Sequence, residues 1–160
     1  MAKRPIPSPV EAPRGIPKAS VDAKGRLKLP VDFQRYLDAV DGGKVFVASL
    51  DHLTARIYPI SVWKENERFF DSFMEDPDAS LHISFSVNEL GAESEMDSEG
   101  RILLPQELRR KLNLENQAVW LHHYRGGINV YNAEVYQELQ SRSAEDRAGK
   151  LRLLAQRGFK

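Results

Sequence analysis

Two short segments of this 160-residue chain carry the same charged residues at the same spacing around a glycine. The sequence Asp-x-x-Gly-Arg occurs at 22–26 and again at 97–101, 75 positions later. An Asp with Gly three places later is typical of a tight turn, because the Asp side chain accepts hydrogen bonds from nearby backbone N–H groups and Gly adopts positive φ. The turn would hold the arginine at a loop tip, where its guanidinium can reach a phosphate or a guanine edge.

The arginines of these loops, Arg26 and Arg101, have two compatible roles. In the first role, each pairs with the aspartate of its own motif and locks the turn. In the second role, each contacts double-stranded DNA, where a bidentate contact to guanine is worth about 1–3 kcal/mol of discrimination between bases. The residues expected to orient the loops are Asp22 and Gly25 in the first copy and Asp97 and Gly100 in the second.

Other cations lie close to the first loop in the sequence. Arg14, Lys18 and Lys24 are candidates for additional DNA contacts, and the alternative is that they are solvated surface charges. The basic run 109–111 falls in a short expected helix, where cations near the C-terminus stabilise the helix dipole. The candidate DNA-binding residues are therefore Arg26, Arg101, Lys24, Arg14 and Lys18.

The sequence does not bring together the residue types needed for catalysis or metal binding. His122 and His123 lie in an expected strand, so their side chains point to opposite faces. His52 and His82 have no ligand-like neighbours at metal spacing, and there is no Gly-rich phosphate loop or nucleophile elbow. The lack of cysteine excludes disulfides and thiolate metal sites. We therefore expect no catalytic residues, no metal or other cofactor, and no small-molecule substrate.

The similarity between the two halves continues beyond the loops and predicts the elements that hold them. After each loop, alternating apolar residues predict a strand with one buried face, and Pro30 and Pro105 suit the first position of a short helix. A strand, a turn and a second strand follow, and then a helix that begins near Ser61 in one half and near Asn132 in the other. Each half alone would expose a sheet face, so we expect the two halves to pack together.

Charge is unevenly distributed along a chain whose formal net charge is zero. Residues 1–30 and residues 101–160 each carry a net charge of +5, whereas residues 51–100 carry −9. No Lys or Arg occurs from Phe69 to Gly100. Because affinity for DNA comes largely from displaced counterions, this distribution is more informative than the neutral total, which hides basic ends around an acidic middle.

The composition is that of an ordinary globular protein. Hydrophobic residues make up 41% and charged residues 29%, which permits a core and argues against general disorder. No apolar run is long enough to span a bilayer, and no hydrophobic stretch follows the basic N-terminus. These features predict a cytoplasmic protein without a membrane segment.

Both ends of the chain differ from the repeated part. Residues 1–17 hold five of the nine prolines, and residues 1–13 are expected to form a disordered Pro-rich arm. Residues 141–160 form a basic tail, which is either a loose terminal helix or a contact with a neighbouring subunit.

The second motif and the residues after it, 97–114, closely resemble the DNA-binding loop and helix of AbrB-type transcriptional regulators. Two such units in one chain, with the segment Tyr58-Pro-Ile-Ser-Val-Trp63, resemble the MraZ family over about residues 14–140. The resemblance implies a mixed α/β (α+β) fold, a duplicated AbrB-like interleaved β-barrel with flanking helices, which assembles into a homo-oligomeric ring. It also implies a nucleoid-associated transcriptional regulator that binds short repeated motifs at the promoter of the bacterial division and cell-wall gene cluster. The arginine that family members present to DNA maps onto Arg26 and Arg101.

The resemblance divides the chain into a first unit at 14–60, a connector at 61–90 and a second unit at 91–140. It implies a helix in the connector, whereas the alternation from Leu81 to Val87 is typical of a strand. Glu99 stands where the first motif has Lys24, which predicts weaker attraction of phosphate by the second loop. An alternative function is an AbrB-like protein-interaction module such as an antitoxin-type partner binder, although antitoxins of that type usually carry one unit and an acidic tail.

Overall fold

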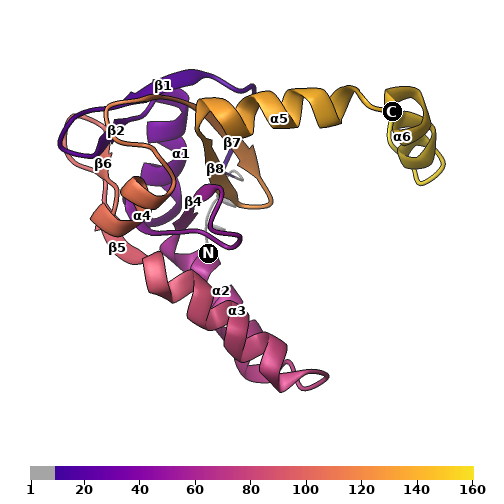
Figure 1. Ribbon diagram of the computed structural model, residues 1–160, viewed down its shortest axis with the longest axis horizontal. Helices are drawn as coiled ribbons and strands as arrows, with labels where there is room; N and C mark the ends of the chain where they lie inside the picture. Colours follow the sequence, from indigo (N-terminus) through magenta and orange to yellow (C-terminus); the bar gives the residue numbers. More distant parts are fainter. Residues whose placement is uncertain (1–9) are drawn as a thin grey trace, which may run out of the picture.

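The computed structural model describes residues 10–160, and residues 1–9 of the expected Pro-rich arm lie outside this range. The elements, in chain order, are β1 (Lys18–Val21), β2 (Arg26–Lys28), α1 (Val31–Asp41), β3 (Lys44–Ala48), β4 (Ala55–Pro59), α2 (Ile60–Ser72), α3 (Pro77–Leu90), β5 (Ala92–Glu95), β6 (Arg101–Leu103), α4 (Gln106–Lys111), β7 (Ala118–Tyr124), β8 (Gly127–Tyr131), α5 (Ala133–Ala144) and α6 (Arg147–Ala155). The order strand–strand–helix–strand–strand–helix therefore occurs twice (Figure 1). Residues 10–13 form no helix or strand, and Pro13 is buried.

The strands of the described chain form one antiparallel sheet that curls into a nearly closed barrel. Its order is β5-β3-β4-β8-β7-β1-β2-β6, and the Ser94 hydroxyl donates a hydrogen bond of 3.1 Å to the Leu103 carbonyl oxygen between the two edge strands. Four pairings join strands from different halves, namely β1 with β7, β2 with β6, β3 with β5, and β4 with β8. The halves are interleaved, so the expected mixed α/β interleaved barrel with flanking helices is confirmed.

The register of two of these pairings relates the halves by an approximate two-fold axis. Leu27 pairs with Ile102 at the centre of β2 and β6, and these positions have the same 75-residue offset as the two loops. Arg56 pairs with Asn129, its counterpart in the second half, where β4 meets β8. The axis passes through both pairs. The two Asp-x-x-Gly-Arg loops consequently lie at opposite ends of one short two-stranded ribbon made of β2 and β6.

Both halves contribute apolar side chains to a shared core. Leu27 and Ile102 are fully buried in the barrel, and α1 adds Phe33 and Leu37. Side chains of this size contribute about 1.5–3 kcal/mol each when buried. A smaller cluster holds α2 and α3 against β3 and β4, and it consists of Phe46, Ala48, Tyr58, Trp63 and Val87. The core therefore fixes the ribbon on its inner face and leaves its outer face free.

The helix starts partly match the sequence signals. Pro30 and Pro105 directly precede α1 and α4, at the N-cap rather than the first helical position. Asn132 caps α5 as expected, because its side chain accepts a hydrogen bond of 2.8 Å from the Val135 backbone N–H.

The expected cap at Ser61 is wrong by two positions, since α2 begins at Ile60 with Pro59 as its N-cap. Asp41, at the end of α1, supplies the missing acceptor. Its Oδ2 accepts hydrogen bonds from the backbone N–H of Ser61 at 2.9 Å and from the Ser61 hydroxyl at 2.8 Å. A carboxylate from the preceding helix therefore replaces the local cap, and the local sequence does not predict it.

Residues 81–87 lie inside α3, so the helix implied by the resemblance is confirmed and the strand suggested by alternation is wrong. Asp76 caps α3 by accepting a hydrogen bond of 3.1 Å from the Ala79 backbone N–H, and Pro77 occupies the first turn. The alternating residues Leu81 and Phe85 are exposed on the helix rather than buried on a sheet face. The cap at Asp76 and the proline at the first turn therefore start a helix that the alternation did not indicate.

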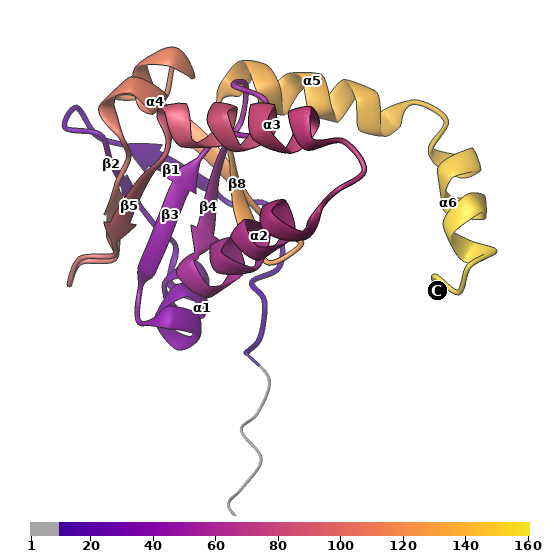
Figure 2. The ribbon, with the colours of Figure 1, turned by 90° about the horizontal axis from the view of Figure 1, so that it is seen from below.

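Two helical parts extend away from the barrel. The hairpin of α2 and α3 projects from one side, and α5 carries α6 outward in a different direction (Figures 1 and 2). The basic tail of the chain contains the end of α5 and all of α6, with a bend at Glu145 and Asp146 between them. Within residues 10–160, none of the helices has both the length and the apolar content that a bilayer-crossing segment needs.

Candidate nucleic-acid interface

The first loop is a tight turn held by one carboxylate. Asp22 Oδ1 accepts hydrogen bonds of 2.9 Å from the backbone N–H groups of Lys24 and Arg26. Its Oδ2 accepts a third bond, of 2.7 Å, from the Arg26 Nε. Gly25 has φ +84°, in the left-handed region that glycine adopts without steric cost. The spacing of Asp and Gly in the sequence predicts this turn correctly.

The second loop repeats this arrangement. Asp97 Oδ1 accepts hydrogen bonds of 2.9 Å from the backbone N–H groups of Glu99 and Arg101, and its Oδ2 accepts a bond of 2.9 Å from Arg101 Nε. Gly100 has φ +74°. Both arginines therefore pair with the aspartate of their own motif. Each guanidinium donates its Nε–H to the aspartate of its own loop, which fixes the orientation of the group.

The ionisation of the loop residues favours the charged forms. The pKa of Asp22 is lowered, first by the hydrogen bond from the Arg26 backbone N–H and also by the Arg26 side chain. The pKa of Asp97 is lowered in the same way by Arg101. The pKa of Arg101 is raised, first by its hydrogen bond to Asp97 and further by the charges of Glu99 and Asp22. The influence of Asp22 on Arg101 reflects how close the two loops lie on the ribbon.

Each loop glycine lies beneath a side chain from the other half of the chain. A Cβ at Gly25 would overlap the guanidinium of Arg109 in α4, and a Cβ at Gly100 would overlap the amide of Gln34 in α1. Arg109 Nη1 donates a hydrogen bond of 2.7 Å to the Leu104 carbonyl oxygen, so its position is fixed. Glycine is therefore required at positions 25 and 100 for two reasons: the backbone has positive φ, and there is no space for a Cβ atom.

Gln34 is held at the equivalent place of the first half, where its Nε2 donates a hydrogen bond of 2.7 Å to the Leu29 carbonyl oxygen. The loops are also tied together through the backbone. The Leu104 N–H donates to the Gly25 carbonyl oxygen at 2.9 Å, and the Leu29 N–H donates to the Gly100 carbonyl oxygen at 3.0 Å. Each loop is therefore supported by the opposite half, a feature that neither motif reveals by itself.

The outer face of the β2–β6 ribbon carries the cations. Arg26 pairs with Leu103, Lys28 pairs with Arg101, and the central Leu27–Ile102 pair faces the core. Side chains alternate between faces along a strand, so Arg26, Lys28 and Arg101 all lie on the outer face. Lys28 was missed by the sequence analysis. The strand predicted after the loop was a sufficient signal, because burial of Leu27 on its inner face places both neighbours of Leu27 outward.

The two ends of the ribbon differ in charge. In the second loop, Glu99 Oε2 lies 3.4 Å from Arg101 Nη1, and the Glu99 side chain is 67% exposed. Lys24, at the equivalent position of the first loop, is a cation and does not form an ion pair with Arg26. Among residues 10–160, the salt bridge of Arg26 is to Asp22 alone. Counting the Asp, the third motif residue and the Arg, the first loop carries +1 and the second carries −1. Leu103, which is 54% exposed, occupies the position in the second half that Lys28 occupies in the first, so the second half lacks this cation.

The other expected DNA-binding residues lie at different distances from the ribbon. Lys24 is exposed at the tip of the first loop. Lys18, at the start of β1, has its Nζ 5.8 Å from the centre of the Trp120 ring and lines a surface hollow together with Lys28. Arg14 is exposed in the segment before β1, at the end of that strand opposite to the loop. Lys18 and Lys24 therefore flank the ribbon, and Arg14 is set apart from it.

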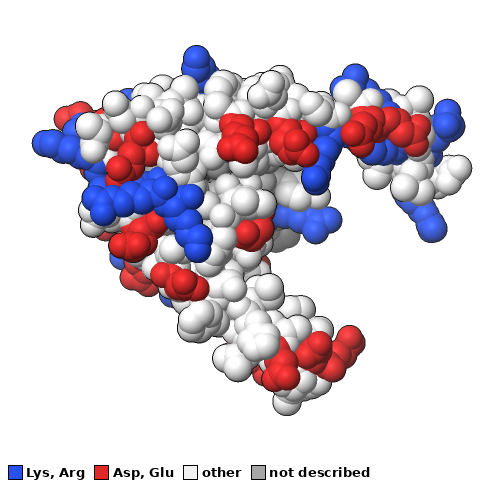
Figure 3. All heavy atoms as spheres, in the orientation of Figure 1, with Lys and Arg blue, Asp and Glu red and all other residues white. Residues whose placement is uncertain are grey.

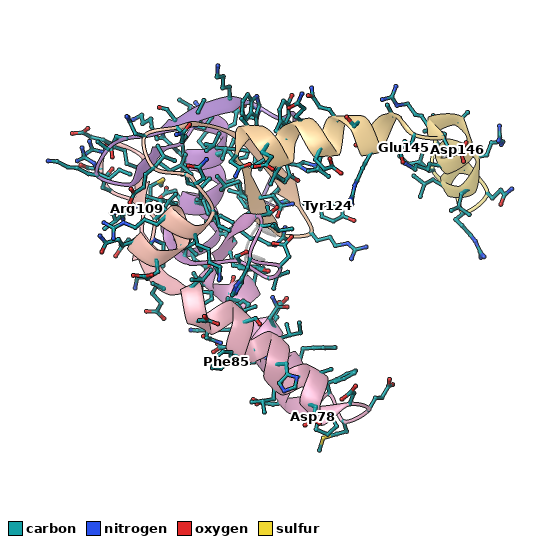
Figure 4. The ribbon with its side chains drawn as sticks, in the orientation of Figure 1. Asp78, Phe85, Arg109, Tyr124, Glu145 and Asp146 are labelled. Carbon is teal, nitrogen blue, oxygen red and sulfur yellow. The ribbon has the colours of Figure 1, made fainter. Side chains whose placement is uncertain are left out.

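A second group of cations lies over α4 (Figure 3). Arg109, Arg110 and Lys111 occupy the last turn of α4, as expected for charges that stabilise a helix end. Arg109 Nε also contacts Glu115 Oε1 at 2.9 Å, and Arg110 Nε lies 3.5 Å from the same oxygen. Figure 4 labels Arg109 on this helix, beside the ribbon. This group is partly neutralised and supports the first loop through Arg109.

The histidines do not form a joint site. His122 Nδ1 is 2.9 Å from the Tyr131 hydroxyl, whereas the His123 ring packs edge-on against Tyr36 with ring centres 4.8 Å apart. Across residues 10–160, no three His, Cys, Asp or Glu side chains are grouped in a way that could hold a metal ion.

A family model and several known proteins that match this chain carry the same family name. Residues 91–157 match the family model described as "MraZ protein, putative antitoxin-like". The chain is 36% identical over 136 residues to "Transcriptional regulator MraZ" of Acidobacterium capsulatum, which covers 83% of this chain and 92% of that protein. It is 34% identical to the protein of the same name from Desulfitobacterium hafniense over 79% of this chain and 85% of the relative. The corresponding protein of Nitrosomonas europaea is 36% identical over 110 residues, or 66% of this chain and 72% of the relative.

Proposed function

This chain belongs to the MraZ family of transcriptional regulators, and we propose that it binds double-stranded DNA through the outer face of the β2–β6 ribbon. The observation that carries this proposal is the joint presentation of Arg26, Lys28 and Arg101 on that face, with both arginines oriented by a loop carboxylate. The proposal therefore concerns the structural elements that the two Asp-x-x-Gly-Arg motifs build together rather than either motif alone.

A two-stranded ribbon has suitable dimensions for reading DNA. The major groove of B-form DNA is about 12 Å wide and admits either a helix or a two-stranded β-ribbon. Strands in a pair are about 4.8 Å apart, so side chains from both strands reach the base edges on either side of the groove axis. Several regulators use β-ribbons in this way.

The loop geometry prepares the arginines for a bidentate contact. Because Asp22 accepts the Nε–H of Arg26, the remaining guanidinium donors are held in one orientation before DNA arrives. A guanidinium placed in the groove donates two hydrogen bonds to guanine O6 and N7, and Lys28 contributes a charge to the adjacent phosphates. The first loop provides the stronger contact in this proposal, because its net charge is +1 and that of the second loop is −1.

One chain offers two loops of unequal charge, which favours binding by several copies together. A homo-oligomeric ring would present many ribbons to a series of short repeats, and the effective concentration of each additional contact would be high. We assign the promoter of the division and cell-wall gene cluster as the target and a nucleoid-associated, cytoplasmic location, following the family.

The test is a mobility shift with DNA from upstream of the chain's own gene. The double variant Arg26→Ala, Arg101→Ala is expected to lose most of the specific complex. The matched control is Arg35→Ala with Lys44→Ala, which removes two exposed cations that are not part of the ribbon. Circular dichroism of each variant checks that the barrel is retained. Equal binding by the double variant and the wild type would reject the ribbon as the DNA-binding surface.

A further inference from the structure

The end of the chain forms a helix that buries none of its side chains. Every residue from Gln137 to Lys160 is exposed except Gly149, and α6 lies at the outer end of α5, away from the barrel (Figures 1 and 2). Asp146 caps α6 by accepting a hydrogen bond of 3.2 Å from the Gly149 backbone N–H. Figure 4 labels Asp146 at the bend between the two helices. Lys150 Nζ donates a hydrogen bond of 2.9 Å to the Arg142 carbonyl oxygen of α5, so local polar contacts and not apolar packing set the direction of α6.

A helix of this length needs support from outside. The α6 helix has nine residues, and isolated helices shorter than about 12–15 residues are marginal in water. Leu151 and Leu154 lie three positions apart and therefore on one face of the helix. Their side chains are 48% and 51% exposed, so this apolar face is not covered within the chain. Leu153 of the same helix is 62% exposed, and exposed leucines on a helix too short to be stable alone indicate a surface that is covered in the assembled protein.

The charges around these leucines form a regular pattern. Arg147 lies four positions before Leu151, and Arg157 lies three positions after Leu154. These four residues line one side of the helix and the turn after it in the order basic, apolar, apolar, basic. We call this set, Arg147, Leu151, Leu154 and Arg157, the basic stripe.

The α3 helix carries the complementary pattern on its exposed side. Leu81 and Phe85 are 63% and 66% exposed, and Asp78 and Glu89 lie three positions before and four positions after them. The order is acidic, apolar, apolar, acidic, and Figure 4 labels Asp78 and Phe85 on the projecting hairpin. No Lys or Arg lies between positions 69 and 100 to offset these charges. We call this set, Asp78, Leu81, Phe85 and Glu89, the acidic stripe.

We propose that the basic stripe of one copy docks on the acidic stripe of the next copy. At a helical rise of about 1.5 Å per residue, the basic stripe is about 15 Å long and the acidic stripe about 16 Å long, so the terminal charges can meet while the apolar pairs pack together. A neighbouring copy is the occupant because the two stripes lie on separate projections of one chain (Figure 2). DNA does not suit an acidic surface, and the basic stripe places leucines at its centre.

The contact is heterologous, because two different surfaces meet, and repetition of such a contact generates a closed ring when the rotation permits. The homo-oligomer is part of the proposed function, and this inference names the surfaces through which its copies meet. It does not depend on whether the ribbon binds DNA. It also explains why the middle of a DNA-binding chain is acidic: that segment would serve assembly rather than DNA.

A charge-exchange experiment tests the contact in the full chain. Light scattering after size-exclusion chromatography would give the mass of the wild type, which is expected to be a multiple of 18.2 kDa. Arg147→Glu with Arg157→Glu should reduce the mass to that of one chain, and Asp78→Lys with Glu89→Lys should do the same. The chain with all four substitutions should recover the wild-type mass, because both stripes are reversed together.

The control is Arg35→Glu with Lys44→Glu, which makes the same change of charge on exposed side chains outside both stripes and should leave the mass unchanged. A monomeric wild type would overturn the proposal. So would a variant with one stripe reversed that retains the wild-type mass, or a four-substitution chain that fails to reassemble. Binding to DNA with a single repeat, measured in parallel, should stay within about twofold of the wild type in all these variants. The ribbon variant Arg26→Ala with Arg101→Ala should lose this binding but keep the wild-type mass. Failure of the assembly proposal can therefore be distinguished from failure of the DNA-binding proposal.

Discussion

Replacing Glu99 by Lys is expected to strengthen DNA binding at the second loop. The Glu99 carboxylate is 3.4 Å from Arg101 Nη1, so in the proposed complex it would compete with phosphate for this guanidinium. Because the Glu99 side chain is 67% exposed, the substitution changes charge without disturbing the core. It also changes the net charge of the loop from −1 to +1, which is the charge of the first loop.

The size of the effect follows from counterion release. Each phosphate contact on B-form DNA contributes a slope of about −0.9 in the logarithm of affinity against the logarithm of salt concentration. One additional contact at about 0.15 M salt therefore multiplies the affinity by about fivefold, and the slope becomes steeper by about 0.9. The free energy of unfolding should change by less than about 0.5 kcal/mol, as for most exposed substitutions.

Fluorescence anisotropy of labelled DNA over a series of salt concentrations measures both the affinity and the slope. The matched control is Lys24→Glu at the equivalent position of the first loop, which should weaken binding and make the slope shallower. The exchange of both residues, Lys24→Glu with Glu99→Lys, keeps the net charge of the chain at zero and separates loop charge from total charge. If Glu99→Lys leaves affinity and slope at wild-type values, the second loop does not approach DNA and the reasoning is refuted.

Further predictions concern the stability of the loop and of the barrel. Gly25→Ala should lower the free energy of unfolding by about 2–3 kcal/mol in chemical denaturation, from the positive φ and the displaced, hydrogen-bonded Arg109, whereas Gly15→Ala, at φ +83° with open space, should cost only about 1–2 kcal/mol. Equal losses would contradict the close packing of Arg109. Burial, with a smaller effect of nearby Arg56, lowers the pKa of His123, so the unfolded chain binds more protons below about pH 6.5 and the melting temperature should fall from pH 7.5 to pH 5.5. His123→Phe should reduce that fall, and a variant with the wild-type pH dependence would exclude His123 as its cause.

Local signals in the sequence predict the two loops well because the relevant interactions lie within five residues. The carboxylate of Asp22 reaches N–H groups two and four positions away, and Gly25 takes the positive φ that the turn requires. The same is true of the cap at Asn132. For interactions of this range, residue type and spacing determine the geometry.

Interactions between the two halves could not be predicted from either half. Arg109 covers Gly25 only because α4 of one half lies over the loop of the other, and this requires the register in which Leu27 meets Ile102. Lys28 is placed beside Arg101 by the same register, 73 positions away in sequence. Without knowledge of that pairing, the outer face of the ribbon cannot be assembled from its parts.

The α3 helix illustrates a conflict between two local patterns. Alternation from Leu81 to Val87 favours a strand, but that inference assumes that the apolar residues are buried on one face of a sheet. Leu81 and Phe85 are instead exposed on a helix whose start is set by Asp76 and Pro77. Apolar residues that pack against another copy therefore make a helix look like a strand, because the sequence pattern treats every apolar residue as buried within its own chain.

Hydrogen–deuterium exchange of the protein with and without its promoter DNA tests most directly where DNA binds. Bound DNA should slow exchange in the segments 22–28 and 97–103, with the larger protection in the first segment, and should leave α6 and the outer part of α3 unchanged. Protection confined to α4 or to the basic tail, with both ribbon segments exchanging as in the free protein, would contradict the account.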